Sequence, residues 1–158
     1  MFSINNKTPL SSARVVKALL FSATLLSVSA NSAIAKSSDT TIHFAKDAVS
    51  STVTGKLKSN EDEHWYRFDA AALQYAIINI APLAGTPETA NTGVLYMPNG
   101  TQDGTKGGII YQGCLPATGE YRLRIARNLM ATHGKTAGYK AEVLILPKYA
   151  SKTLCENK

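Results

Sequence analysis

The 158-residue chain has few of the residues from which metal and redox sites are most often built: two cysteines and three histidines. The histidines lack the spacing of metal ligands, and two cysteines are too few for a convincing metal site on their own. Neither Gly-x-Ser-x-Gly nor His-Glu-x-x-His occurs in the sequence. We therefore expect a protein that is not an enzyme and that needs no metal or cofactor.

Long apolar runs are also missing after the N-terminal segment. The first 35 residues carry three basic and no acidic residues, then an apolar run over 18–28, and end on Ala33-Ile34-Ala35. This order predicts a secretory signal peptide that is cleaved after Ala35. The alternative, a membrane anchor, is disfavoured because about eleven apolar-leaning residues are too few to cross roughly 30 Å of hydrocarbon. We expect a periplasmic protein with no membrane partner.

A strong excess of one charge is absent from the remaining residues, 36–158. The formal net charge falls from +6 to +3 without the first 35 residues, because 14 basic residues then face 11 acidic ones. This balance argues against a nucleic-acid partner. The length suits one domain with its own core, and a tail from about residue 148 has so little pattern that we expect it to be loose. The oligomeric state is not indicated.

The two cysteines, Cys114 and Cys155, both lie in the exported part of the chain. An even number of cysteines in an oxidising compartment predicts one disulfide, which would tie the tail to the middle of the domain. A free, buried Cys114 with a frayed Cys155 is the alternative.

Short segments with strand patterns recur through the exported part. They cover residues 41–44, 49–58, 64–70, 75–81, 93–97, 107–111, 121–126 and 139–145. No helical periodicity of useful length accompanies them, although three consecutive alanines within 70–75 would support one helical turn. The pattern predicts an all-β fold, an antiparallel sandwich of about eight short strands. A closed eight-stranded barrel fits the same spacing, but the short, unequal strands favour the sandwich.

The most readable segment is 115–128. Pro116 to Gly119 is predicted to be a turn, because proline fixes its own φ and glycine permits a sharp reversal. From Tyr121 onward apolar and polar residues alternate, which places Tyr121, Leu123 and Ile125 on one buried face of a strand. Arg122 and Arg124 are then expected on a solvated face.

Several short motifs follow one another in an order that resembles the periplasmic inhibitors of goose-type (g-type) lysozyme. They are Gly55-Lys56-Leu57-Lys58, Tyr66-Arg67-Phe68, Leu115 to Arg124, Arg127-Asn128 and Lys135-Thr136-Ala137-Gly138-Tyr139. The element formed by the turn, Gly119 and Tyr121 also resembles the pre-peptidase C-terminal domains of secreted enzymes. The cysteine pair and the loop around Glu88 have no counterpart that we recognise in the inhibitors.

The resemblance implies a β-sandwich that protects the cell wall by inserting loops into the active-site cleft of g-type lysozyme. Thr118-Gly119-Glu120-Tyr121 occupies the position of the Ser-Gly-x-Tyr loop of the inhibitors, with threonine in place of serine. The substitution retains a hydroxyl group and adds a methyl group. The residues that we predict to contact the lysozyme are Thr118, Gly119, Tyr121, Arg127 and Asn128.

The residues themselves give modest support to this interpretation. Muramidase clefts work through carboxylates, which hydroxyl and guanidinium donors on a rigid protrusion would match. Arg127 stands where the strand becomes a loop, and the connection to Ala137 is long and carries Leu129 and Met130, as a contact surface would.

Structural roles are the alternative for the same residues. Tyr121 suits a core position at a strand start, and Thr118 and Gly119 suit turn geometry alone. A module that binds glycan or peptidoglycan is the alternative function, because Trp65, Tyr75, Tyr96 and Tyr111 offer rings on which sugars stack, although packing is the more ordinary role for Trp65.

Overall fold

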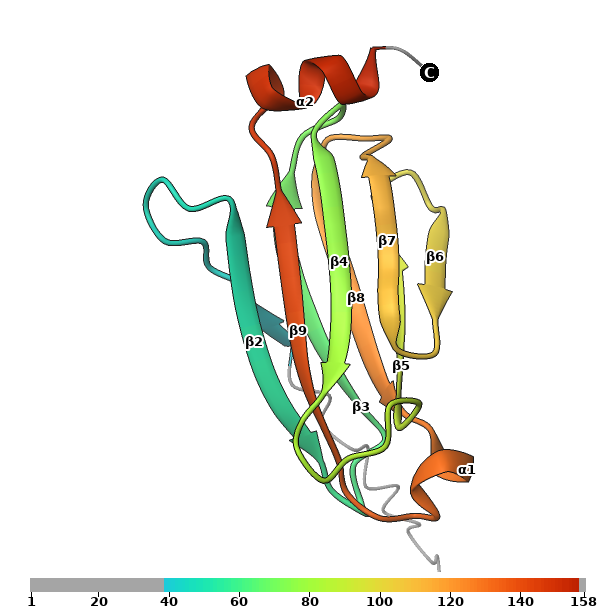
Figure 1. Ribbon diagram of the computed structural model, residues 1–158. Helices are drawn as coiled ribbons and strands as arrows, with labels where there is room; N and C mark the ends of the chain where they lie inside the picture. Colours follow the sequence, from blue (N-terminus) through green and yellow to red (C-terminus); the bar gives the residue numbers. More distant parts are fainter. Residues whose placement is uncertain (1–38, 157–158) are drawn as a thin grey trace, which may run out of the picture. The chain divides into compact units, whose positions relative to one another are not determined.

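The computed structural model describes residues 39–156, so the predicted signal peptide lies outside the described residues. Two sheets pack face to face as the layers of a sandwich (Figure 1). The strands are β1 (Asp39–Thr41), β2 (Ser50–Leu57), β3 (Glu63–Ala70), β4 (Tyr75–Pro82), β5 (Asn91–Tyr96), β6 (Gln102–Thr105), β7 (Gly108–Cys114), β8 (Gly119–Arg127) and β9 (Ala137–Ile145). The five-stranded sheet has the order β1-β3-β8-β5-β6, and the four-stranded sheet has the order β2-β9-β4-β7. This confirms the sandwich over the closed alternative.

Strand β8 is the centre of the five-stranded sheet, between β3 and β5. Its register pairs Ala70 with Gly119 at one end and Glu63 with Ala126 at the other. All pairings are antiparallel except that of β1, which runs parallel to β3. The segment that begins with the predicted turn therefore spans the whole length of the sandwich.

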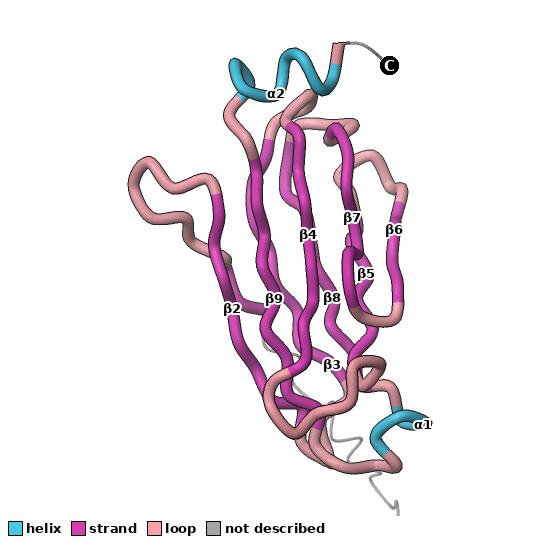
Figure 2. The backbone as a smooth tube through the Cα atoms, viewed as in Figure 1, coloured by secondary structure: helices cyan, strands magenta, loops and turns pink. Residues whose placement is uncertain are grey.

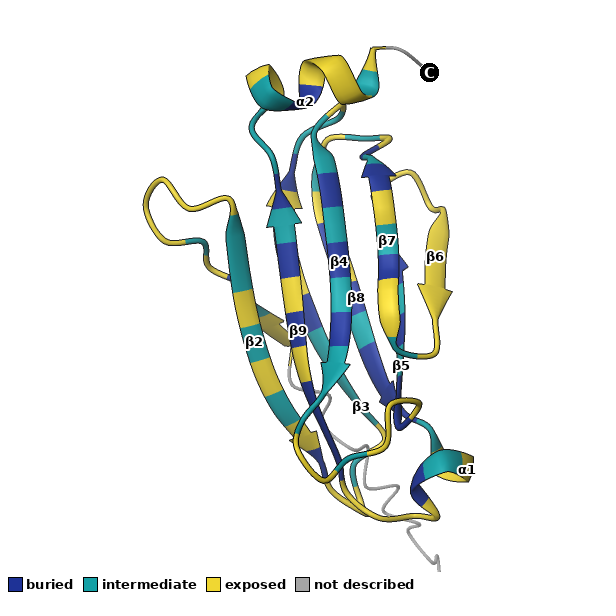
Figure 3. Ribbon diagram, in the orientation of Figure 1, coloured by how far each residue is buried: buried dark blue, intermediate teal, exposed yellow. Residues whose placement is uncertain are grey.

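Alternation along the strands separates the core from the surface (Figure 3). Tyr121, Leu123 and Ile125 are fully buried, as the period-two pattern predicts. Gly55 allows a close approach between β2 and the core, because a β-carbon there would overlap the ring of Tyr139. The Tyr139 hydroxyl lies 2.6 Å from that of Tyr66, and burial raises the pKa of Tyr139 strongly. A single tyrosine network thus joins the two sheets inside the core.

The connections gather at two ends of the sandwich (Figure 2). We call the end that carries α2 (Lys148–Cys155) the α2 end, and the end that carries α1 (Leu129–Thr132) the α1 end. The turns 71–74, 97–101 and 115–118 lie at the α2 end, whereas the connections 58–62 and 128–136 lie at the α1 end. The predicted turn at Pro116 to Gly119 and the connection from Arg127 to Ala137 are therefore at opposite ends.

Helix α2 corrects the expectation of a loose tail. Ser151 is fully buried, and its hydroxyl oxygen accepts a hydrogen bond from the Tyr75 amide at 2.8 Å. The predicted disulfide between Cys114 and Cys155 is present, with 5.7 Å between the Cα atoms. These two attachments fix a helix of only 8 residues, which is too short for helical periodicity to stand out in the sequence.

Three further expectations are corrected. The first strand is 39–41 and parallel to its neighbour, so the sheets are not wholly antiparallel. Strand β6 was missed because all four of its residues are exposed, which leaves no apolar alternation to read. The alanines at 70–72 form no helical turn, since the chain reverses there through Leu73, whose φ is +65°.

Candidate protein-binding site

The turn 115–118 is fixed to the neighbouring turn by backbone hydrogen bonds. Leu115 is fully buried, its amide donates to the Gln74 carbonyl, and its carbonyl accepts from the Leu73 amide, each at 2.9 Å. The turns that precede β4 and β8 are thus joined at the α2 end. A turn that is held on both sides of its apex keeps its shape when it meets a partner.

Tyr121 supports this turn from inside the core. Its ring is fully buried and stacks on Phe68, with 5.6 Å between centroids. Its hydroxyl donates to the Ala117 carbonyl at 2.6 Å, and burial raises the pKa of the hydroxyl. The structure therefore places Tyr121 beneath the turn, as a packing residue that shapes it.

Gly119 begins β8 in a backbone conformation that other residues rarely adopt, with φ at +148°. A β-carbon there would lie 3.1 Å from the Cβ atom of Pro98 in the adjacent turn. Both the dihedral angle and the neighbour favour glycine at this position.

Thr118 is the exposed polar residue of the turn. Its hydroxyl oxygen accepts a hydrogen bond from the Ala72 amide at 2.9 Å, which fixes the position of the oxygen. The hydroxyl hydrogen has no acceptor among residues 39–156. Thr118 therefore presents an oriented donor to solvent.

Arg127 lies at the other end of β8, about 30 Å from Thr118 at roughly 3.3 Å per residue of strand. Its side chain is only 3% exposed. The guanidinium group donates to the carbonyls of Gly134 and Ser59, each at 2.9 Å, and lies 3.3 Å from an Asp62 carboxylate oxygen. The interpretation of Arg127 as an exposed donor is corrected, since its hydrogen bonds join two loops inside the α1 end.

Asn128 completes this arrangement. Its side-chain oxygen accepts from the Ala131 amide and caps α1, and its side-chain nitrogen donates to the Thr89 carbonyl at 2.8 Å. Of the five predicted contact residues, the structure thus groups Thr118, Gly119 and Tyr121 at the α2 end and Arg127 and Asn128 at the α1 end.

No family model and no curated protein sequence matches the chain. Solved structures do match it. The periplasmic lysozyme inhibitor PliG of Aeromonas hydrophila, which inhibits g-type lysozyme, gives a TM-score of 0.56 with 19% identity, over 69% of this chain and 96% of that one. A mutant PliG from Escherichia coli gives 0.53 with 23% identity, over 70% and 99%.

This chain has the fold of the PliG inhibitors. The resemblance that the motifs predict is confirmed at this level. The pre-peptidase C-terminal domain of a Bacillus anthracis collagenase also matches, with a TM-score of 0.51 and 17% identity over 68% of this chain and 95% of that one. Because the fold is shared with a domain of another kind, the function has to be argued from the site.

The four aromatic residues that the glycan alternative requires are divided between the two sheets of this PliG-like sandwich. Trp65 and Tyr96 lie on the five-stranded sheet with 5.4 Å between ring centroids, and the Arg122 guanidinium covers the Trp65 ring at 4.6 Å. Tyr75 and Tyr111 lie on the other sheet. The structure thus offers no single platform made of all four rings.

Leu73 is a further candidate contact residue that the sequence does not predict. It is 60% exposed, and a positive φ places it at the apex of the turn beside Thr118. Exposed leucine in a strained turn favours a contact role over a packing role. The sequence offers one local signal near Leu73, the run of alanines that ends just before it, and that run predicts a helical turn and not an exposed contact residue.

Residues 39–156 contain no group of three or more histidine, cysteine or acidic side chains that could hold a metal ion. No helix in the same range is long and apolar enough to cross a membrane.

Proposed function

We propose that the protein is a periplasmic inhibitor of g-type lysozyme and that it inserts the turn 115–118 into the active-site cleft of the enzyme. The observation that carries this proposal is the exposed hydroxyl of Thr118, whose oxygen is fixed by the Ala72 amide and whose hydrogen is free. The fold shared with PliG inhibitors supports the same conclusion.

The chemistry of the cleft suits this donor. Glycoside hydrolases of the lysozyme type use carboxylates at the scissile bond. A hydroxyl group that donates to a carboxylate forms a short, charge-assisted hydrogen bond, about twice as strong as one between neutral groups. Because Tyr121 and Leu115 already fix the turn, little conformational entropy is lost when it enters the cleft.

Gly119 and Tyr121 act in this proposal by shaping the turn. Arg127 and Asn128 act at a distance, by holding the loop 128–136, on which Leu129 and Met130 are 56% and 85% exposed. That loop is a second candidate contact, and its apolar side chains are available to a large partner.

The test is muramidase activity of a g-type lysozyme, measured against the concentration of the wild type and of Thr118 variants. Thr118→Val keeps the shape but removes the donor, so we expect inhibition to weaken roughly 5- to 150-fold, in line with about 1–3 kcal/mol for a buried polar contact. Thr118→Ser retains the hydroxyl and is expected to inhibit like the wild type. A folded Thr118→Val protein with unchanged inhibition would move the contact elsewhere.

The glycan-binding alternative predicts a different outcome. A glycan module would bind isolated sacculi without lysozyme and would leave muramidase activity unchanged. The match with the collagenase domain is one of fold alone, and the division of the aromatic residues between the two sheets speaks against the alternative.

A further inference from the structure

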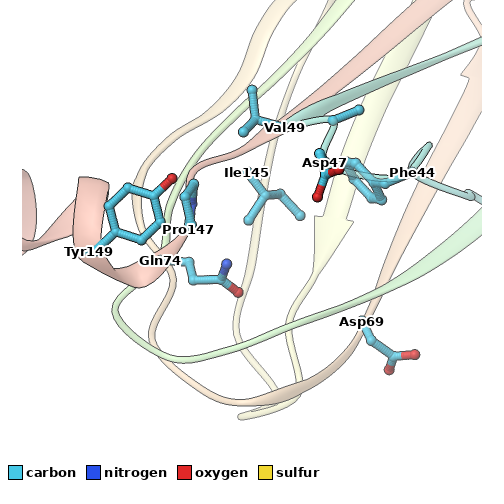
Figure 4. Close-up of a pocket in the computed structure, with 9 residues that line it drawn as sticks. Phe44, Asp47, Val49, Asp69, Gln74, Ile145, Pro147 and Tyr149 are labelled. Atoms are coloured by element: carbon cyan, nitrogen blue, oxygen red, sulfur yellow. The ribbon is translucent and has the colours of Figure 1, made fainter.

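A pocket of about 450 Å³ lies at the α2 end, beside the turn that carries Thr118. It is bounded by the connection between β1 and β2, by the end of β9 with the start of α2, and by the turn between β3 and β4 (Figure 4). Its volume falls within the range of roughly 300–1,000 Å³ that is typical of ligand pockets.

About half of the pocket wall is apolar. Phe44, Val49, Ile145 and Tyr149 line it, and Tyr149 is 85% exposed although it is a large aromatic residue. A tyrosine that is left open beside a pocket offers a ring face to whatever enters.

Two carboxylates, Asp47 and Asp69, complete the lining, and in Figure 4 Asp47 lies next to Phe44 while Asp69 lies apart at the rim. Neither forms a hydrogen bond or an ion pair with any residue of the described range. Four other acids, Asp39, Asp62, Glu63 and Glu120, do lie within 4.0 Å of an arginine nitrogen.

No lysine, arginine or histidine lines the pocket. The first turn of α2 adds a partial positive charge, equivalent to about half an elementary charge, which is smaller than the charge of the two carboxylates. The pocket is therefore net negative, and about half of its wall is apolar.

Gln74 ties this pocket to the proposed lysozyme contact. Its side chain accepts from the Ala71 amide at 2.7 Å and donates to the Leu146 carbonyl at 3.0 Å, while its backbone carbonyl holds Leu115. Gln74 thus belongs both to the lining of the pocket and to the support of the turn 115–118.

We infer that the pocket binds one lysine or arginine side chain of the protein partner. Such a side chain has an apolar stem and a cationic head. The stem would pack on Val49 and Ile145, the head would meet Asp47, and the rings of Phe44 and Tyr149 would add cation–π attraction. Because the partner is the same lysozyme, this inference rests on the proposed function.

The first test compares two double variants with the same change in charge. Asp47→Asn/Asp69→Asn removes both pocket carboxylates, whereas Glu88→Gln/Glu142→Gln removes two exposed carboxylates outside the α2 end. Binding to g-type lysozyme is measured by titration calorimetry at low and high salt. We expect the pocket variant to bind at least 10-fold more weakly at low salt, with a smaller difference at high salt, and the control to bind like the wild type. Equal affinities for the two variants would overturn the inference and leave the proposed function intact.

The second test uses a small probe and separates the two claims. N-acetyl-lysine methylamide and its uncharged analogue N-acetyl-norleucine methylamide are titrated into the ¹⁵N-labelled protein. We expect chemical-shift changes at residues 47, 69 and 149 with the lysine probe alone, and their loss in Asp47→Asn/Asp69→Asn. If the wild type inhibits no lysozyme but gives these changes, the proposed function is wrong while the specificity of the pocket for a cationic side chain stands. Identical responses to the two probes would overturn the inference.

Discussion

Arg127 buries a charged guanidinium group at the α1 end of β8, where it holds two loops together. Replacing it by methionine would leave the carbonyls of Ser59 and Gly134 without their donor. We expect Arg127→Met to lower the free energy of unfolding by about 3 kcal/mol, as is typical when a buried charged network loses one partner. Urea denaturation of the purified variant measures this change.

The matched control is Asp62→Asn, because Asp62 is the acidic partner of Arg127 and its side chain is 82% exposed. An exposed carboxylate contributes little to an ion pair, so we expect a much smaller loss of stability. If the two variants were equally stable, the structural role of Arg127 would be contradicted.

The alternation along β8 encodes the burial of Arg127. Residue 127 has the same parity as Tyr121, Leu123 and Ile125, so continuing the period-two pattern by one step places Arg127 on the inner face. The residue type without the alternation predicts the opposite, because a basic residue at the end of a strand is expected to be an exposed donor. The role of Thr118 is different, because its bond to Ala72 spans 46 residues and no local pattern encodes it.

Helix α2 depends on attachments to the sheet more than on its own sequence. Breaking the disulfide frees a chain segment with a sequence separation of 41 residues, which costs about 4 kcal/mol on the chain-entropy model. We expect Cys114→Ala/Cys155→Ala to lower Tm by about 10 °C or more for a domain of this size, measured by calorimetry.

A matched control for this experiment is the same measurement on the wild type under strong reduction. Both are expected to reach a similar Tm, with the turn 115–118 preserved because Leu115 keeps its backbone bonds to the neighbouring turn. An unchanged Tm in both cases would show that the disulfide does not stabilise the domain.

The pairing of β3 with β8 carries a pH dependence through Glu63. A hydrogen bond from the Trp65 indole, and next to it the Arg124 guanidinium, hold the pKa of Glu63 below its usual value of 4.5. A carboxylate with a lowered pKa stabilises the folded state above the pKa of the unfolded chain, and this stabilisation is lost as the pH falls. We therefore expect Glu63→Gln to lower stability at neutral pH and to match the wild type at a pH well below 4.5.

Thermal unfolding followed from pH 7 to pH 3 measures this difference. Glu88→Gln is a suitable control, because Glu88 is exposed and its carboxylate forms no hydrogen bond or ion pair within the described range. A constant difference between Glu63→Gln and the wild type across this pH range would contradict the assignment.

Alternation of apolar and polar residues, together with turn residues, predicts those strands and turns that depend on local sequence. The central strands and the turn at Pro116 to Gly119 follow from local pattern, and so does the inward face of β8. Helix α2 was not predicted, because it is held in place by bonds to residues that are distant in the sequence. Strand β6 was not predicted either, because an exposed edge strand needs no apolar alternation.

At the scale of the whole molecule, the sandwich places its two sets of loops at opposite ends, so the ends can serve different purposes. The α2 end combines Thr118, the exposed Leu73 and the acidic pocket, whereas the α1 end is organised around the buried Arg127. The predicted fold class is confirmed. Thr118 and Arg127 are both predicted to contact the lysozyme, but the length of β8 places them at opposite ends of the sandwich.

Inhibition of a purified g-type lysozyme by the mature protein tests the central claim most directly. Muramidase activity is measured as the protein is added, with chicken-type and invertebrate-type lysozymes as parallel samples. We expect the g-type activity to fall in proportion to the added protein until it is lost, and the other two enzymes to be much less affected. Full g-type activity in the presence of a large excess of folded protein would contradict the account.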